Sequence, residues 1–127
     1  MSALVLDAGA FVAVDRGDRE IFVRLRRAQQ AGLHLRTTGV VIAQVWRDPG
    51  GRHANLARLL KSVDVWAVDH RLGREMGVLL GRAGAQDAVD ASVVAIATSG
   101  DRILTSDPDD IQPLVAAAKR SILVVPC

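Results

Sequence analysis

The sequence predicts an α/β fold, with a central parallel β-sheet of four to five strands and helices on both faces. Two observations lead to this prediction. Short apolar runs that are typical of buried strands alternate along the chain with stretches of helical periodicity. The 127 residues also contain no repeat and no low-complexity linker, and half of them are hydrophobic, which suffices for a core without disulfides. We therefore expect residues 1–127 to form a single domain.

In the first half of the chain, apolar spacing and helix-breaking residues define the elements. Ile21, Phe22 and Leu25 share one face of a helix that ends before Gly32. The Pro-Gly-Gly run at 49–51 separates two later helical segments. The expected elements are a strand at residues 3–6, helices at 8–14 and 18–30, a strand at 33–37, and helical segments around 40–45 and 56–60.

In the second half, a glycine repeat and an apolar segment stand out. Gly73, Gly77 and Gly81 recur every four residues, which places bare backbone on one helical face and predicts a closely packed neighbouring helix. The segment 88–98 is almost entirely apolar, so we expect a buried helix there. The other expected elements are a strand at 65–68, a helix at 72–84, a strand at 103–105, a helix at 108–118 and a strand at 122–125.

Composition excludes several classes of protein. Cys127 is the only cysteine, so the chain has no internal disulfide and no cysteine-based zinc site, as fits a cytoplasmic location. No apolar stretch approaches the roughly 20 residues that cross a bilayer. The apolar N-terminal run has no basic residue before it and contains Asp7, so we interpret it as a strand rather than a secretion signal.

Charge is unevenly distributed although the net charge is only +2. Residues 16–61 hold ten Arg or Lys against three acids, a balance of +7, whereas residues 85–127 hold three basic residues against six acids, a balance of −3. This pattern suits a protein that attracts a phosphate backbone and holds a cation with carboxylates. On charge alone, however, arginines on the solvated faces of amphipathic helices are the favoured interpretation.

Four aspartates fall where strands end or helices begin. Asp7 follows the first strand, Asp107 follows the strand at 103–105, and Asp87 and Asp90 open the buried helix. Ligand sites of parallel sheets lie beyond the carboxyl ends of the strands. Helix capping explains Asp7, Asp87 and Asp107 equally well, whereas Asp90 lies among valines and needs a partner or a cation. Position alone therefore leaves helix caps and a functional cluster as equal alternatives.

A carboxylate cluster has a definite chemistry. Clustered carboxylates repel one another, and Mg²⁺ or Mn²⁺ relieves that repulsion while leaving positions for water and phosphate oxygens. Such an ion lowers the pKa of a bound water and stabilises charge on the leaving oxygen of a phosphodiester.

Five segments that together span essentially the whole chain are LDAGAF, VVIAQVWRD, the glycine-bearing helix, DAVDASVVAIA and ILTSDPDDI. In this order and at these spacings they resemble the PIN domain, and particularly the VapC toxins of bacterial toxin–antitoxin pairs. The resemblance implies a Mg²⁺- or Mn²⁺-dependent endoribonuclease that hydrolyses RNA. It also implies a homodimer that is held inactive by a cognate antitoxin.

By motif, the resemblance assigns the site residues. Asp7, Asp90 and Asp107 match the acids that are catalytic and bind the metal, while Asp87 and Thr105 match accessory positions.

One position departs from the family pattern. Gln44 stands where these proteins usually have glutamate, and an amide offers a metal one neutral oxygen but no charge. An alternative function is therefore a catalytically weakened module that binds RNA or an antitoxin. Nearby Arg47 is a weak candidate for a phosphate contact, although a cation also suits the end of a helix. A phosphoryl-transfer domain ranks lower, because Gly9 replaces the second aspartate of the phosphatase pattern.

Overall fold

Five parallel strands form one sheet in the computed structural model, which describes residues 2–47, 50–51 and 53–127. The sheet order is β3-β2-β1-β4-β5, and every neighbouring pair is parallel. The strands are β1 (Ala3–Leu6), β2 (His34–Thr38), β3 (Val63–Trp66), β4 (Arg102–Thr105) and β5 (Leu123–Pro126). The predicted α/β class and parallel sheet are thus confirmed.

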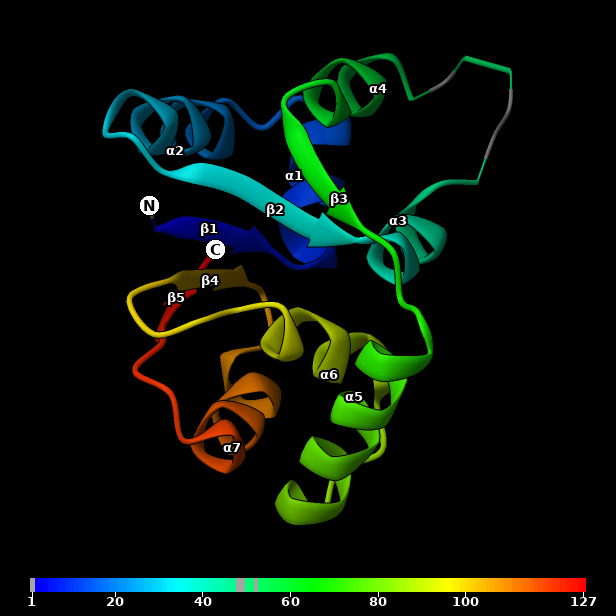
Figure 1. Cartoon of the computed structure of the whole chain (residues 1–127). Helices are drawn as coiled ribbons and strands as arrows, with labels where there is room; N and C mark the ends of the chain where they lie inside the picture. Colours follow the sequence, from blue (N-terminus) through cyan, green and yellow to red (C-terminus); the bar gives the residue numbers. More distant parts are fainter. Residues whose placement is uncertain (1, 48–49, 52) are drawn as a thin grey trace.

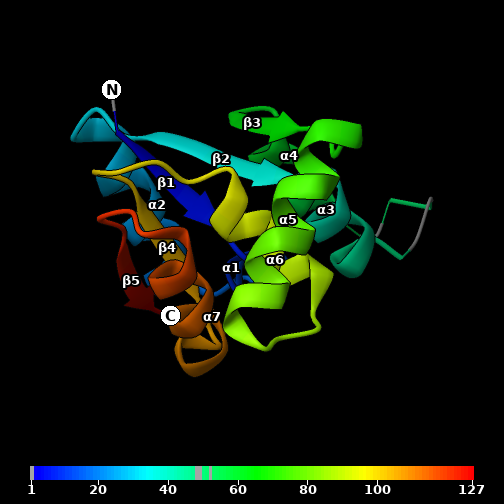
Figure 2. The ribbon, with the colours of Figure 1, turned by 60° about the horizontal axis from the view of Figure 1, so that its bottom comes forward.

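Helices cover both faces of this sheet, as predicted. Figure 1 shows α1, α2 and α4 on one face and α5, α6 and α7 on the other, with α3 at the edge where the strands end. After rotation, Figure 2 shows α5, α6 and α7 side by side, and these three helices pack against one another. The helices are α1 (Ala8–Asp15), α2 (Arg19–Gln30), α3 (Gly39–Val45), α4 (Ala54–Leu60), α5 (His70–Ala83), α6 (Ala88–Ala95) and α7 (Pro108–Ala118). In the described ranges, no helix is long and apolar enough to span a bilayer.

The prediction of a helix packed on the α5 glycines is wrong. No atom of another described element lies within 4 Å of a Cβ built on Gly73, Gly77 or Gly81. Instead, α5 packs through Met76 and Leu79, whose side chains are buried. Larger side chains bury more apolar area than glycine backbone does, so they decide which face of the helix turns inward.

Smaller differences concern element boundaries. Strand β3 begins two residues before the predicted range of 65–68, and α6 ends three residues before the predicted end at 98. The break expected at Pro49 lies outside the described residues.

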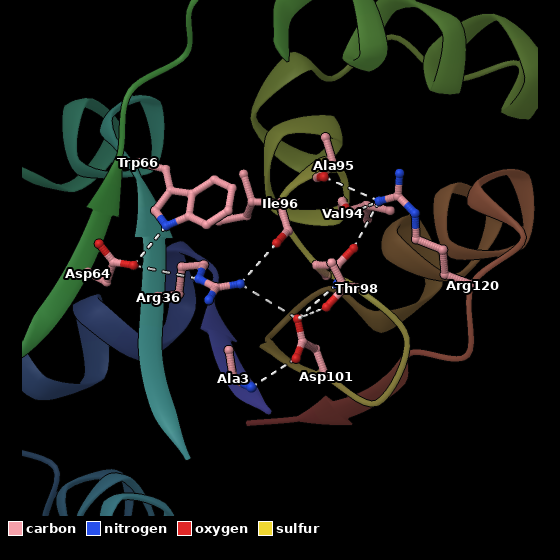
Figure 3. A network of polar contacts seen from close by, with 11 residues as sticks. Ala3, Arg36, Asp64, Trp66, Val94, Ala95, Ile96, Thr98, Asp101 and Arg120 are labelled. Atoms are coloured by element: carbon pink, nitrogen blue, oxygen red, sulfur yellow. Dashed lines mark hydrogen bonds and ion pairs between the residues drawn. The ribbon is translucent and has the colours of Figure 1, made fainter. Parts of the chain in front are cut away.

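A buried acid ties the amino-terminal ends of β1 and β4 to the end of α6. Asp101 is 3% exposed and accepts hydrogen bonds from the backbone N–H of Ala3 and of Thr98, both at 2.8 Å, and from the Thr98 hydroxyl at 3.1 Å. A guanidinium nitrogen of Arg36 on β2 lies 3.7 Å from the same carboxylate (Figure 3). Three strands therefore converge on a single charge.

Two arginines fix the carboxyl end of α6 within this network. Arg120 donates to the carbonyls of Val94, Ala95 and Ala97, and Arg36 donates to the carbonyl of Ile96 (Figure 3). A cation at this end also interacts favourably with the helix dipole. Because α6 carries Asp90, this network sets the position of that carboxylate from the opposite end of the helix.

We expect Asp101→Ala to lower the free energy of unfolding by about 3 kcal/mol, because it leaves the Arg36 charge largely buried with a weak partner. The matched control is Asp64→Ala, which removes the other carboxylate near Arg36. The side chain of Asp64 is 61% exposed, so its loss should cost less than about 1 kcal/mol. Urea unfolding of the three proteins measures both effects, and equal losses would contradict the prediction.

Candidate functional site

The strand order reverses between β1 and β4, and two of the predicted acids follow these two strands. β1 and β4 pair directly in parallel, with Leu6 opposite Leu104. Asp7 and Asp107 therefore both lie at the carboxyl edge of the sheet, on either side of the reversal point. Open α/β sheets bind their ligands at this place.

Asp7 is a buried carboxylate that is held by two hydrogen bonds. It is 3% exposed; one oxygen accepts from the backbone N–H of Ala8 at 2.8 Å, and the other accepts from the hydroxyl of Thr105 at 2.7 Å. The Thr105 oxygen in turn accepts from the backbone N–H of Asp107 at 3.0 Å. The structure thus places Thr105, which the resemblance makes accessory, between the two acids.

The capping alternative explains some of these acids but not all of them. Asp87 caps α6 by accepting from the N–H groups of Val89 and Asp90, and Asp7 accepts from the first residue of α1. Asp107 occupies the N-cap position of α7, yet its side chain makes no capping hydrogen bond. Its carboxylate is exposed, so helix capping does not account for this aspartate.

The pKa of Asp90 reflects the negative charges of the acids around it. Burial, followed in size by the negative charges of Asp87, Asp7, Asp110 and Asp107, raises the pKa of its carboxyl from 3.8 to about 7. The three acids assigned by the resemblance therefore share one electrostatic environment. Asp110 belongs to it too; sequence reasoning missed this residue, although its place one helical turn after Asp107 was a usable signal.

The donor set fits a hard divalent cation in its chemistry. Its side chains offer carboxylate oxygens, which Mg²⁺ and Mn²⁺ prefer, and their mutual repulsion is what such a cation relieves. The arrangement is not preassembled, because no group of three or more His, Cys, Asp or Glu side chains in the described part of the chain is disposed to hold a metal ion. Binding would therefore require these side chains to move together.

A close backbone approach brings the two acid-bearing segments together. A Cβ built on Gly9 would lie 2.5 Å from Oγ and 3.2 Å from the backbone nitrogen of Ser106. Only glycine therefore allows the first turn of α1 to lie against the loop between β4 and α7. Sequence reasoning did not assign this role to Gly9, because the contact joins segments almost one hundred residues apart.

Gln44 and Arg47 lie on or next to α3 and are exposed. Within the described residues the Gln44 side chain makes no hydrogen bond, either to the carboxylates or to another group. The guanidinium of Arg47 donates to the carbonyls of Ala43 and Trp46 at 2.8 and 2.9 Å, which closes the end of α3. The helix itself packs on α6, and the hydroxyls of Thr38 and Ser92 lie 2.9 Å apart.

An all-parallel sheet between two helical layers, with acids where the strand order reverses, defines an α/β protein with a candidate ligand site at its carboxyl edge. More narrowly, the chain has a VapC-like PIN fold. It resembles a chain in the crystal structure of VapBC2 from Rickettsia felis bound to a DNA fragment from their promoter, with a TM-score of 0.70 over 98% of each chain. Sequence identity is 11%, so this likeness concerns the fold.

Comparison by sequence adds no relative. No protein-family model matches the chain, and no curated protein matches it.

The Gly9 contact predicts opposite effects for two substitutions to alanine. Gly9→Ala forces Ser106 away and should lower the free energy of unfolding by about 1–3 kcal/mol. Gly77→Ala, on the open face of α5, should raise it by about 0.5–1 kcal/mol through helix propensity. Urea unfolding measures both values, and a stabilised Gly9→Ala protein would show that the close approach does not constrain the fold.

The raised pKa of Asp90 predicts a pH dependence of stability in EDTA. Because the folded protein binds this proton more tightly than the unfolded chain does, stability should fall as pH rises from about 4 through 7. Asp90→Asn should remove that loss, so that the variant melts above the wild type at pH 8 and equally at pH 4. Thermal unfolding tests this, with Asp109→Asn as an exposed control; a slope unchanged by Asp90→Asn would rule the effect out.

Proposed function

We propose that this protein is a metal-dependent endoribonuclease that acts as the toxin of a toxin–antitoxin pair, hydrolysing RNA with Mg²⁺ or Mn²⁺. The observation that carries the proposal is the electrostatically coupled set Asp7, Asp90 and Asp107 at the strand reversal of a VapC-like PIN fold. Residues 1–127 act as a single PIN-like domain in this proposal. Similarity of fold to VapBC2 supports the class of protein, and the acids support the chemistry.

Asp7, Asp90 and Asp107 would hold the metal ion. When bound, the ion would supply an activated water and neutralise charge on the phosphate. Thr105 orients Asp7, because its hydroxyl donates to one carboxylate oxygen while the Ala8 N–H donates to the other. Asp87 contributes the largest of the neighbouring charges that raise the pKa of Asp90. With its pKa raised to about 7, the Asp90 carboxyl is only partly ionised near neutral pH, and a bound cation would compete with the proton for it.

A second candidate function is a weakened PIN-like module that binds RNA or an antitoxin without cutting. The neutral amide of Gln44 favours it, because this side chain brings no charge to the site. In either case we propose a cognate antitoxin as a partner, a homodimer as the assembly and the cytoplasm as the location. The antitoxin proposal is supported by the VapBC2 complex, which was crystallised with promoter DNA.

The decisive test incubates the purified protein, freed of any antitoxin, with total RNA in Mn²⁺, Mg²⁺ or EDTA. We expect discrete fragments that require a metal ion. Asp7→Asn should reduce their rate of formation by more than roughly 100-fold, because it removes a charge from the proposed metal site. Asp109→Asn, which removes an exposed acid from the first turn of α7, should leave the rate nearly unchanged.

Gln44→Glu separates the two candidate functions. Intact RNA under every condition, together with retained binding of RNA, would favour the binding module, and Gln44→Glu should then create metal-dependent cleavage. If Gln44→Glu is also inactive in every metal, the nuclease proposal fails.

A further inference from the structure

A basic groove lies between α5 and α7, away from the carboxylates. Its volume is about 440 Å³, and Val78, Leu79 and Ala118 form its apolar floor, of which Val78 is exposed. Glu75 is the one acid among the residues that line it. The lining also contains His70 and four arginines, Arg71, Arg74, Arg82 and Arg120.

Two of these four arginines have no partner among the described residues. Arg71 pairs with Glu75 at 3.4 Å, and Arg120 uses one guanidinium nitrogen to cap α6. Arg74 and Arg82 are exposed and make no ion pair or hydrogen bond within the described residues. Two free guanidinium groups beside an apolar floor suit an anionic ligand that also has flat apolar parts.

The groove is elongated along α5. Positions 71, 74, 78 and 82 recur at spacings of three or four residues, so they share one helical face. The eleven residue steps from Arg71 to Arg82 correspond to about 16 Å at the helical rise. Cations spread over such a length match a polymer with a charge on every unit better than they match a single small anion.

The direction of the groove relates it to the candidate site. Residues 84–87 join α5 to α6, and Ala95 near the end of α6 lies beside Leu72 near the start of α5, so the two helices run antiparallel. Arg82 therefore lies at the end where Asp87 opens α6. The groove extends from this end toward Arg120, along the packed helices seen in Figure 2.

We propose that this groove binds the phosphate backbone of single-stranded RNA and holds the strand that continues outside the carboxylate site. The inference rests on the proposed function, because it gives the same substrate a second contact surface. Carboxylates repel phosphates, so the affinity for RNA must come from cations elsewhere. Guanidinium groups bind phosphates and also stack on unpaired bases, for which the apolar floor leaves room.

The test compares two double variants that change the net charge equally. Arg74→Gln/Arg82→Gln removes the free cations of the groove, and Arg26→Gln/Arg58→Gln removes two exposed arginines that line a different groove, between α2 and α4. Fluorescence anisotropy with a labelled oligouridylate in EDTA measures binding over a range of salt concentrations. The groove variant should bind more weakly, and the slope of log K against log salt should decrease by about 1.4, which corresponds to two lost phosphate contacts. The control slope should stay near the wild-type value, and thermal unfolding verifies that both variants are folded.

Several outcomes overturn the inference: equal weakening in the two double variants, no binding of RNA by the wild type, or polyglutamate displacing the label as well as unlabelled oligouridylate of the same length. Failure of the nuclease is distinguishable from failure of the groove. If RNA binds through the groove but is not cut in any metal, only the nuclease proposal is contradicted. If cleavage depends on Asp7 but the groove variant binds RNA as well as its control does, only the groove proposal is contradicted.

Discussion

The parallel pairing of β1 with β4 is the constraint on which the rest of the site depends. At this pair the chain stops adding strands on one side of the sheet and begins to add them on the other, so no crossover helix covers the edge between them. Asp7 and Asp107 are brought together by strand register alone. The Thr105 hydroxyl and the missing side chain of Gly9 then fix the distance between their segments.

The position of Asp90 depends on a different part of the molecule. Half-burying this carboxyl among other acids disfavours its charged form, as its raised pKa shows. The opposite end of α6 compensates, because Arg120 and Arg36 bind the carbonyls that a helix end leaves free. Arg36 also lies over the ring of Trp66, 4.6 Å from its centroid, and near the buried Asp101. The contacts that stabilise α6 and the unfavourable negative charge of Asp90 therefore lie at opposite ends of this short helix.

Local patterns predicted most of the fold and the positions of the principal acids. Apolar runs and capping residues locate Asp7, Asp87 and Asp107, because these signals lie within a few residues of one another. Contacts such as Gly9 with Ser106, or Asp101 with Ala3, join distant segments and leave no periodic trace in the sequence. The prediction for the glycine face of α5 was wrong for a related reason. The spacing of the glycines shows that this face carries no side chains, but it does not show that another element packs against it. The apolar residues after Trp66 extended the predicted strand beyond its true end.

The Thr105 hydroxyl connects the candidate site to the start of α7 through two hydrogen bonds. A hydroxyl has one hydrogen, and Thr105 uses it to donate a hydrogen bond to Asp7. The Thr105 oxygen accepts a hydrogen bond from the backbone N–H of Asp107. The two hydrogen bonds therefore polarise one another in a fixed direction. Any ligand that draws electron density from Asp7 weakens the pull on this proton, and the backbone amide of Asp107 responds. The backbone amide of Asp107 is therefore sensitive to the charge on Asp7, a buried carboxylate with which it makes no direct hydrogen bond.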